Sequence, residues 1–264
     1  MTDTNLRFHG IAPYRVVAIH GGPGAAGEMA PVARRLSREC GVLEPLQTAR
    51  SIAGQIEELR GALSEHSQTR AVLIGYSWGA WLSLLTAARH PELCGKLILV
   101  SCPPFAAPAA AELRARRFDR LDDAEKAAFE AALASLADPA APDQDDSLAT
   151  LGRLAAKADA YSPVDELNEP AEIWIDAGIY RAVWNEASAM RRSGELLRQV
   201  RMVRCPVVAV HGDADSTPVE AVAEPLSAAL TKFRMVVLTR CGHTPWLERY
   251  AQDEFCRTLL DEVG

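Results

Sequence analysis

The sequence lacks the features that mark several classes of protein. It contains no apolar run close to the roughly 18 residues of a membrane-spanning helix, and Met1–Arg15 is too polar to resemble a secretory signal. It has no Lys/Arg-rich run, and its formal net charge of −7 argues against a nucleic-acid partner. The six cysteines are scattered without C-x-x-C pairs, which favours free thiols over disulfides or a metal site. We therefore expect a cytoplasmic protein with no nucleic-acid or membrane partner.

What the chain does contain is an alternation of apolar strands and helices. Nearly half of the 264 residues are apolar, enough for one large domain that carries an insertion. Continuous, β-branched runs predict strands at Arg15–Ile19, Gly41–Leu46, Arg70–Gly75, Lys96–Ser101, Pro206–His211 and Arg234–Leu238. Helical spacing predicts helices at Ala30–Glu39, Ser51–His66 and Ala80–Arg89. This order is typical of an α/β fold with a mainly parallel, doubly wound sheet.

The alternation stops between the third long strand and the fourth. Helical sequence is expected at Ala109–Ala137, Ser147–Ala160 and Ile173–Val200, with a loop at Pro139–Asp146. A long helical insertion between two strands of one sheet is typical of a cap. We therefore predict a core of residues 1–101 and 205–264 and a helical cap of residues 102–204.

The segment Gly75-Tyr76-Ser77-Trp78-Gly79 matches G-x-S-x-G and lies between a predicted strand and a predicted helix. In that setting a tight turn lifts the Ser77 hydroxyl to the start of the helix, where it can act as a nucleophile. An ordinary strand-to-helix turn that happens to contain serine is the alternative.

The segment His20-Gly21-Gly22-Pro23-Gly24 follows the first long strand. Its glycines would let the backbone N–H of Gly22, together with that of Trp78, hold an oxyanion. A plain turn is the competing interpretation, whereas a phosphate-binding loop would need motifs that are absent here.

A serine nucleophile needs a base, and the base needs an acid that orients it. His243 follows the last apolar strand and is the histidine best placed to be the base. After the fourth long strand, Asp213 and Asp215 are both candidate acids, and we choose Asp215 because it lies deeper in the loop. The order Ser, Asp, His is the one expected of an α/β-hydrolase.

These motifs, together with the segment Cys241-Gly242-His243-x-Pro-Trp-Leu-Glu, resemble the α/β-hydrolase superfamily and, within it, the capped group that includes the proline iminopeptidases. The resemblance implies the same roles for Ser77, Asp215, His243, Gly22 and Trp78. It covers the core, whereas the cap is matched only in position and helical character. Members usually have a β-hairpin before the glycine turn, and with only about fifteen residues there we expect a sheet shortened at that edge.

Substrate binding is expected in the cap. The aromatic residues Trp174, Tyr180, Trp184 and Trp246 could form an apolar pocket, although helix packing is the simpler explanation for Trp174 and Trp184. An aminopeptidase would need carboxylates for the substrate amine. Candidates are Glu166, Glu169, Glu172, Asp176 and Glu186, which could equally belong to solvated helix faces.

These observations favour a serine hydrolase that acts on small carboxylic esters or related acyl compounds through an acyl-serine intermediate. The alternatives are an aminopeptidase similar to proline iminopeptidases and, outside the enzymes, a ligand sensor built on this fold. No metal or organic cofactor is implied, because Cys241 and His243 alone do not make a metal site. The expected partner is a small-molecule substrate, and the expected assembly is a monomer or homodimer.

Overall fold

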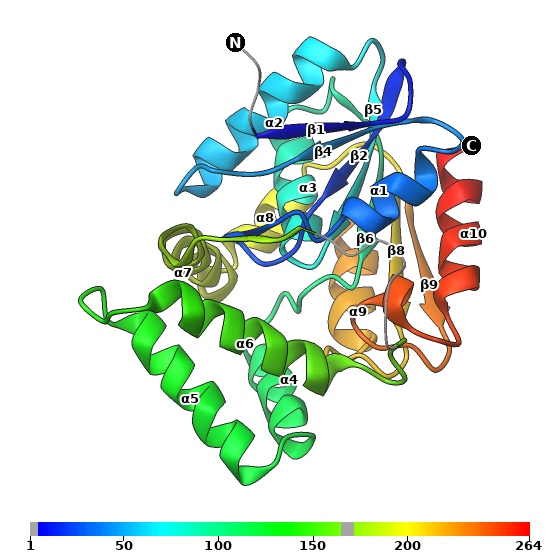
Figure 1. The fold of residues 1–264 in the computed structure, drawn as a ribbon. Helices are drawn as coiled ribbons and strands as arrows, with labels where there is room; N and C mark the ends of the chain where they lie inside the picture. The colour runs from blue at the N-terminus through cyan, green and yellow to red at the C-terminus, as the bar shows by residue number, and fades with distance from the viewer. Residues whose placement is uncertain (1–4, 165–171) are drawn as a thin grey trace.

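The computed structural model describes residues 5–164 and 172–264, and its centre is a seven-stranded sheet of order β1-β4-β2-β5-β6-β8-β9 (Figure 1). All neighbouring strands run parallel except the pair β1 and β4. The prediction of a mainly parallel α/β sheet is confirmed. The strands are β1 (Leu6–His9), β2 (Tyr14–Ile19), β4 (Gly41–Pro45), β5 (Ala71–Tyr76), β6 (Cys94–Val100), β8 (Val207–Gly212) and β9 (Phe233–Leu238).

The short N-terminal segment does contribute a strand to the sheet, which refines the expectation of a shortened edge. Leu6 pairs with Pro45 and His9 with Val42 in an antiparallel register along β4. Leu6 is buried against the core, and His9 Nε2 lies 2.7 Å from a carboxylate oxygen of the buried Glu44. One antiparallel strand therefore stands at this edge, where the resemblance suggested a hairpin.

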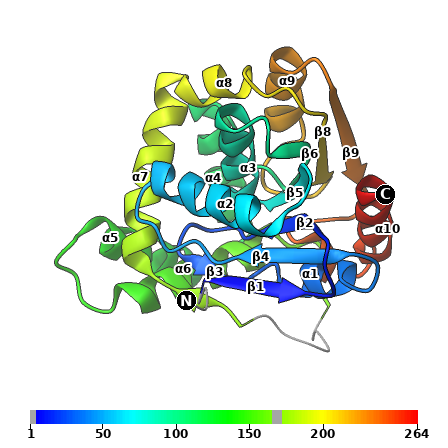
Figure 2. The same cartoon turned by 90° about the horizontal axis from the view of Figure 1, so that it is seen from above.

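Helices cover both faces of the sheet (Figure 2). On one face pack α2 (Ile52–His66), α3 (Trp78–Arg89), α8 (Glu195–Val200) and α9 (Glu220–Ala229). On the other pack α1 (Ala30–Leu36) and α10 (Gln252–Val263). In the described part of the chain, no helix is long and apolar enough to cross a membrane.

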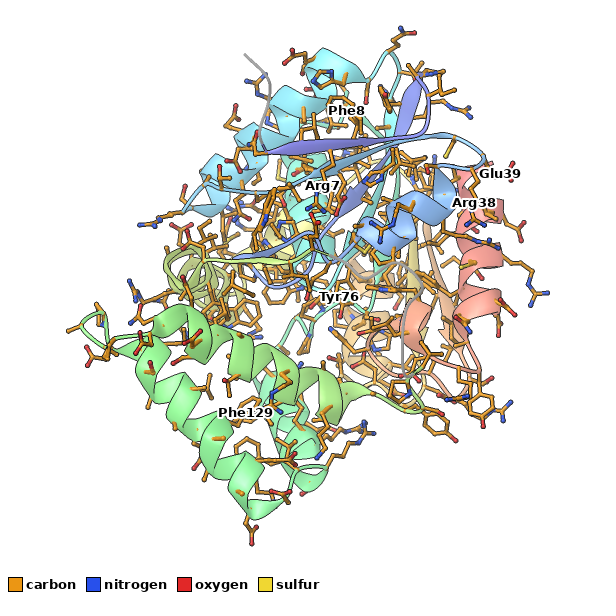
Figure 3. All side chains as sticks on the ribbon, viewed as in Figure 1. Arg7, Phe8, Arg38, Glu39, Tyr76 and Phe129 are labelled. Carbon is orange, nitrogen blue, oxygen red and sulfur yellow. The ribbon has the colours of Figure 1, made fainter. Side chains whose placement is uncertain are left out.

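Residues 102–204 contain two kinds of packing. The helices α4 (Ala107–Asp119), α5 (Asp123–Ala137) and α6 (Gln144–Asp159) share a small apolar cluster, with Phe129 between them and Ala177 at its border (Figures 1 and 3). In contrast, α7 (Ala177–Ser193) and α8 bury Val183 and Val200 in the cluster of the main sheet. We call α4–α6 the outer cap, because α7 and α8 are anchored on the core.

The insertion differs in detail from the predicted helices. The helical run expected over Ala109–Ala137 is interrupted, because Asp122 ends the turn after α4 and caps α5 in a capping box with Glu125. A two-residue strand, β7 (Trp174–Ile175), replaces the start of the helix expected at Ile173. It pairs antiparallel with β3 (Ala25–Ala26), a partner distant in sequence.

Candidate active site

Ser77 occupies a strained turn between β5 and α3. Its φ of 49° and ψ of −116° lie outside the regions that side chains favour. A Cβ at Gly75 would lie 2.2 Å from the carbonyl oxygen of Gly79, and a Cβ at Gly79 would lie 2.5 Å from that of Ile19. Both glycines are therefore required by close backbone contacts, and the turn presents Ser77 at the start of α3.

Gly22 and Trp78 lie on the two segments expected to supply oxyanion donors. Trp78 is the first residue of α3, so its backbone N–H has no acceptor within the helix. Its indole ring is buried, and the indole N–H donates to Gln55 Oε1 at 2.9 Å. Gly22 lines the same cavity as Ser77, in the turn that follows β2. Gly22 and Ser77 therefore face one cavity, and the backbone N–H of Trp78 directly follows Ser77.

His243 and Asp215 come together from two loops that follow neighbouring strands. Nδ1 of His243 donates to Oδ2 of Asp215 at 2.7 Å, and both residues are buried. The other carboxylate oxygen, Oδ1, accepts the backbone N–H of Thr217 at 2.8 Å. Asp213 is exposed and accepts instead from the backbone N–H of Cys241 at 3.2 Å. The aspartate that contacts His243 is therefore Asp215 and not Asp213.

The two groups stabilise each other's charge. Burial alone would raise the pKa of Asp215, but His243 and His211 and the hydrogen bonds from His243 and Thr217 lower it to about 2. Burial alone would lower the pKa of His243, but the charge and hydrogen bond of Asp215 raise it above the usual value. An ionised Asp215 thus favours a protonated imidazole, as a general base requires once it has accepted a proton.

His211 supports this pair from the end of β8, a contact that the sequence analysis did not identify. Its Nε2 lies 2.9 Å from the carbonyl oxygen of Thr217 and 3.6 Å from Oδ2 of Asp215, with no exposed surface. The ring therefore fixes the loop that carries the carboxylate.

Ser77 and His243 line one cavity of about 800 Å³ at the junction of the core and the outer cap. Tyr76 marks this junction in Figure 3. The cap side is lined by the small residues Gly152, Ala155 and Ala156 of α6. Trp246, a predicted substrate-binding residue, lines the core side and contacts the Tyr76 ring edge-to-face at 4.7 Å between centroids. The remaining lining residues are Gly22, Glu28, Pro31, Arg117, Asp159, Val164, Ile173, Thr244 and Leu247.

Three charged residues of this cavity were not identified from the sequence: Glu28, Arg117 and Asp159. Arg117 of α4 donates to both carboxylate oxygens of Asp159, through Nε at 2.9 and 3.0 Å and through Nη2 at 2.5 Å. Glu28 lies in the turn between β3 and α1, and burial raises its pKa to about 7. The pairing of Arg117 with Asp159 joins residues on different helices, which no local motif indicates.

Three more of the predicted substrate-binding residues, Tyr180, Trp184 and Glu186, lie elsewhere. Of the described residues that line the cavity, none is Tyr180, Trp184 or Glu186. Trp184 stacks on Trp81 of α3 and on Tyr180, at 6.1 and 6.3 Å between ring centroids. Glu186 accepts the backbone N–H of Ile52 at 2.9 Å, at the first turn of α2. Trp184 and Glu186 lie on the face of α7 that packs against α2 and α3, so they hold α7 on the core.

The acidic residues considered for binding an amine are also engaged elsewhere where the structure describes them. Asp176 caps α7 by accepting the N–H of Ile179 at 2.8 Å. Glu172 is exposed and lies 3.6 Å from Arg7, whose guanidinium covers the ring of the exposed Trp174. Glu166 and Glu169 fall outside the described residues.

The segment after α6 is bonded to the loop that carries His243. The buried carboxylate of Glu248 accepts the backbone N–H groups of Tyr161 at 2.8 Å, Ser162 at 2.7 Å and Gly242 at 3.0 Å. In addition, the backbone N–H of His243 donates to the carbonyl oxygen of Asp159 at 3.0 Å. The cap and the base therefore share one hydrogen-bonded unit.

Comparison with known proteins identifies the architecture. A family model described as alpha/beta hydrolase fold matches residues 14–250. VinJ is 17% identical with a TM-score of 0.70, over 98% of this chain and 93% of VinJ. Est816, described as an N-acyl homoserine lactone degrading enzyme, is 15% identical with a TM-score of 0.63, over 97% and 95%.

A third similar structure is the meta-cleavage product hydrolase CumD from Pseudomonas fluorescens, 17% identical with a TM-score of 0.60, over 97% of this chain and 92% of that enzyme. At such identities the likeness concerns the fold alone. No curated protein matches this sequence. Among the described residues, no group of three or more His, Cys, Asp or Glu side chains is arranged to hold a metal ion.

Proposed function

Because the chain belongs to the α/β-hydrolase fold family, we propose that it is a serine hydrolase that cleaves small carboxylic esters or related acyl compounds. The observation that carries the proposal is the bond between His243 Nδ1 and Asp215 Oδ2, made beside a cavity that His243 shares with Ser77. An imidazole held in this way keeps Nε2 unprotonated and ready to accept a proton.

In the proposed reaction, the Ser77 hydroxyl attacks the carbonyl carbon of the ester while His243 accepts the hydroxyl proton. The N–H groups of Gly22 and Trp78 stabilise the resulting oxyanion. The carbon–oxygen bond to the alcohol then breaks, and His243 gives its proton to the leaving oxygen. Water attacks the acyl-serine with His243 again as base, which releases the carboxylic acid and restores the Ser77 hydroxyl.

The cavity favours small acyl compounds over polymers. Its volume of about 800 Å³ is in the range of pockets that bind small molecules. Its walls combine apolar residues such as Pro31, Trp246 and Leu247 with few charged groups. Of the similar structures, Est816 is described as degrading N-acyl homoserine lactones and CumD as a hydrolase of meta-cleavage products, and both descriptions name small-molecule substrates.

The two alternatives have less support. An iminopeptidase-like activity was expected to use carboxylates of the cap, and the described candidates, Glu172, Asp176 and Glu186, cap helices or face solvent. A ligand sensor has no need for an imidazole ion-paired beside a serine. We propose a cytoplasmic location on the basis of the free cysteines, and a monomer or homodimer as the assembly.

The test is labelling with a fluorophosphonate probe, followed by mass spectrometry, alongside a panel of p-nitrophenyl esters and proline p-nitroanilide. We expect an adduct on Ser77, ester turnover, and neither in Ser77→Ala. Ser77→Ala and His243→Ala should each lower kcat by roughly 10⁴–10⁶, and the double variant little more. Labelling at another residue, or none with no turnover, would contradict the proposal; anilide cleavage in place of ester cleavage would favour the aminopeptidase.

A further inference from the structure

Glu28 is a cavity residue with one carboxylate oxygen that has no hydrogen-bond partner among the described residues. It lines the same cavity as Ser77 and His243. Its Oε2 is buried, and no described residue donates a hydrogen bond to it. An unpaired buried carboxylate oxygen costs free energy, and a hydrogen-bond donor from a ligand would recover that cost. The other two charged residues described above, Arg117 and Asp159, already form an ion pair with each other.

The position of Glu28 places this oxygen next to the proposed oxyanion site. A Cβ at Gly21 would lie 2.7 Å from Glu28 Oε2 and 2.7 Å from the ring of Tyr76. The carboxylate therefore packs over the backbone of Gly21, which directly precedes Gly22. A carbonyl oxygen bound at Gly22 would bring the neighbouring carbon of the substrate close to Glu28.

The carboxyl group of Glu28 can accept a hydrogen bond from a positively charged donor or from a neutral one. Burial raises its pKa to about 7, against smaller opposing effects of His243 and the Gly21 backbone. Near neutral pH the group is thus present in both forms. The charged form binds an ammonium group strongly, and both forms can accept a hydrogen bond from a hydroxyl group.

We propose that Glu28 is a specificity-determining residue that accepts a hydrogen bond from an amine or hydroxyl on the carbon next to the scissile carbonyl. This inference rests on the proposed function and narrows its substrate class to acyl compounds with a donor at that carbon. The role differs from that of the acidic residues of the insertion, because Glu28 belongs to the turn before α1.

The experiment compares three substrates that differ only in the substituent on the carbon next to the carbonyl, the methyl esters of alanine, lactic acid and propionic acid, by pH-stat titration. We expect the wild-type protein to hydrolyse the alanine or the lactic ester with a kcat/KM about tenfold or more above that of the propionic ester. Glu28→Met, which removes the acceptor at similar volume, should bring the ratio close to one.

Glu28→Gln separates the two donors because it removes the charge but keeps a carbonyl oxygen. Loss of the alanine preference in this variant identifies an ammonium group, and a retained lactate preference identifies a hydroxyl group. Glu39→Gln is the matched control, since Glu39 is exposed at the end of the molecule away from the outer cap (Figure 3), and its ratios should be unchanged.

Equal kcat/KM values for all three esters in the wild-type protein would overturn the proposal, and so would an equal loss for all three in Glu28→Met. If Glu28→Met failed to fold, Glu28→Ala, which also removes the acceptor, would take its place, and unchanged ester preferences in that variant would overturn the proposal. Fluorophosphonate labelling of Ser77 in each variant tests the proposed hydrolase separately, so that its failure is not confused with that of the Glu28 role.

Discussion

Replacing Asp215 by asparagine tests the acid assignment and the hydrogen-bond network together. Oδ1 of Asp215 accepts the N–H of Thr217 at 2.8 Å, and Oδ2 accepts from Nδ1 of His243 at 2.7 Å. In Asp215→Asn, the amide oxygen would keep the bond from Thr217 and the NH₂ group would face His243. The imidazole would then have to carry its proton on Nε2, where it cannot accept the proton of Ser77.

The structure allows an estimate of the size of this effect. The substitution removes a buried negative charge and reverses the hydrogen bond to His243, so we expect kcat to fall roughly 10³–10⁴-fold. This corresponds to about 4–5 kcal/mol in the activation free energy. Asp213→Asn is the matched control, because Asp213 is exposed and its amide oxygen can still accept from Cys241, so kcat should change less than about threefold.

The assay is steady-state hydrolysis of a p-nitrophenyl ester by both variants, with thermal unfolding to confirm that each is folded. A larger loss of kcat in Asp213→Asn than in Asp215→Asn would refute the assignment of Asp215 as the acid. A loss of less than about tenfold in a folded Asp215→Asn would equally refute it, since the reversed hydrogen bond would then not control the tautomer.

Three further predictions concern the base, the elbow and the cap. The pKa of His243 is raised, and the imidazole must be neutral to act as a base. In a pH profile from 5 to 9, kcat/KM should therefore increase with pH through an inflection above pH 6.5. An inflection below pH 6.5 would contradict the hydrogen-bond network of His243 and Asp215. Gly79→Ala places a Cβ against the carbonyl oxygen of Ile19 and should lower the free energy of unfolding by about 3 kcal/mol or more. A Cβ at Gly61 in α2 meets nothing within 4 Å, so Gly61→Ala should raise the free energy of unfolding by about 0.5–1 kcal/mol. Urea denaturation measures both changes. Glu248→Ala leaves three backbone N–H groups unpaired and should cost about 3 kcal/mol or more; an unchanged melting temperature would show that these bonds contribute little.

Local sequence determines the strands of the sheet and the loops that carry Ser77, His243 and Asp215. Their places in the fold could therefore be predicted. Parallel strands end at one edge of a sheet, so loops that follow successive strands bring their residues together whatever the connecting helices do. Gly75 of the elbow is required by a contact within a few residues, that with Gly79, whereas Gly79 is required by the backbone of Ile19 on the neighbouring strand.

The substrate side of the site was predicted poorly because it depends on which helix faces meet. Trp184 was a candidate for the pocket, with helix packing as the simpler explanation, because a tryptophan that stacks on Trp81 has the same sequence pattern as one that binds a ligand. The contact between Arg117 and Asp159 spans 42 positions, and the sequence gives no local sign of it. Glu28 had one usable signal, an acidic residue within a few positions of the glycine turn, although a surface turn would explain it equally well.

The link between Glu248 and the segment after α6 limits how such an enzyme can be remodelled. Exchange of caps between relatives is an obvious route to new specificity, and the connection between α5 and α6 offers an exposed place for insertions. The stretch from Asp159 to Val164 is different, since its backbone bonds to both sides of the histidine loop. A transplanted cap that did not keep this stretch would displace the imidazole along with the old pocket. Successful grafts should therefore retain the stretch from Asp159 to Val164 and vary only the helices that precede it in the chain, α4 to α6.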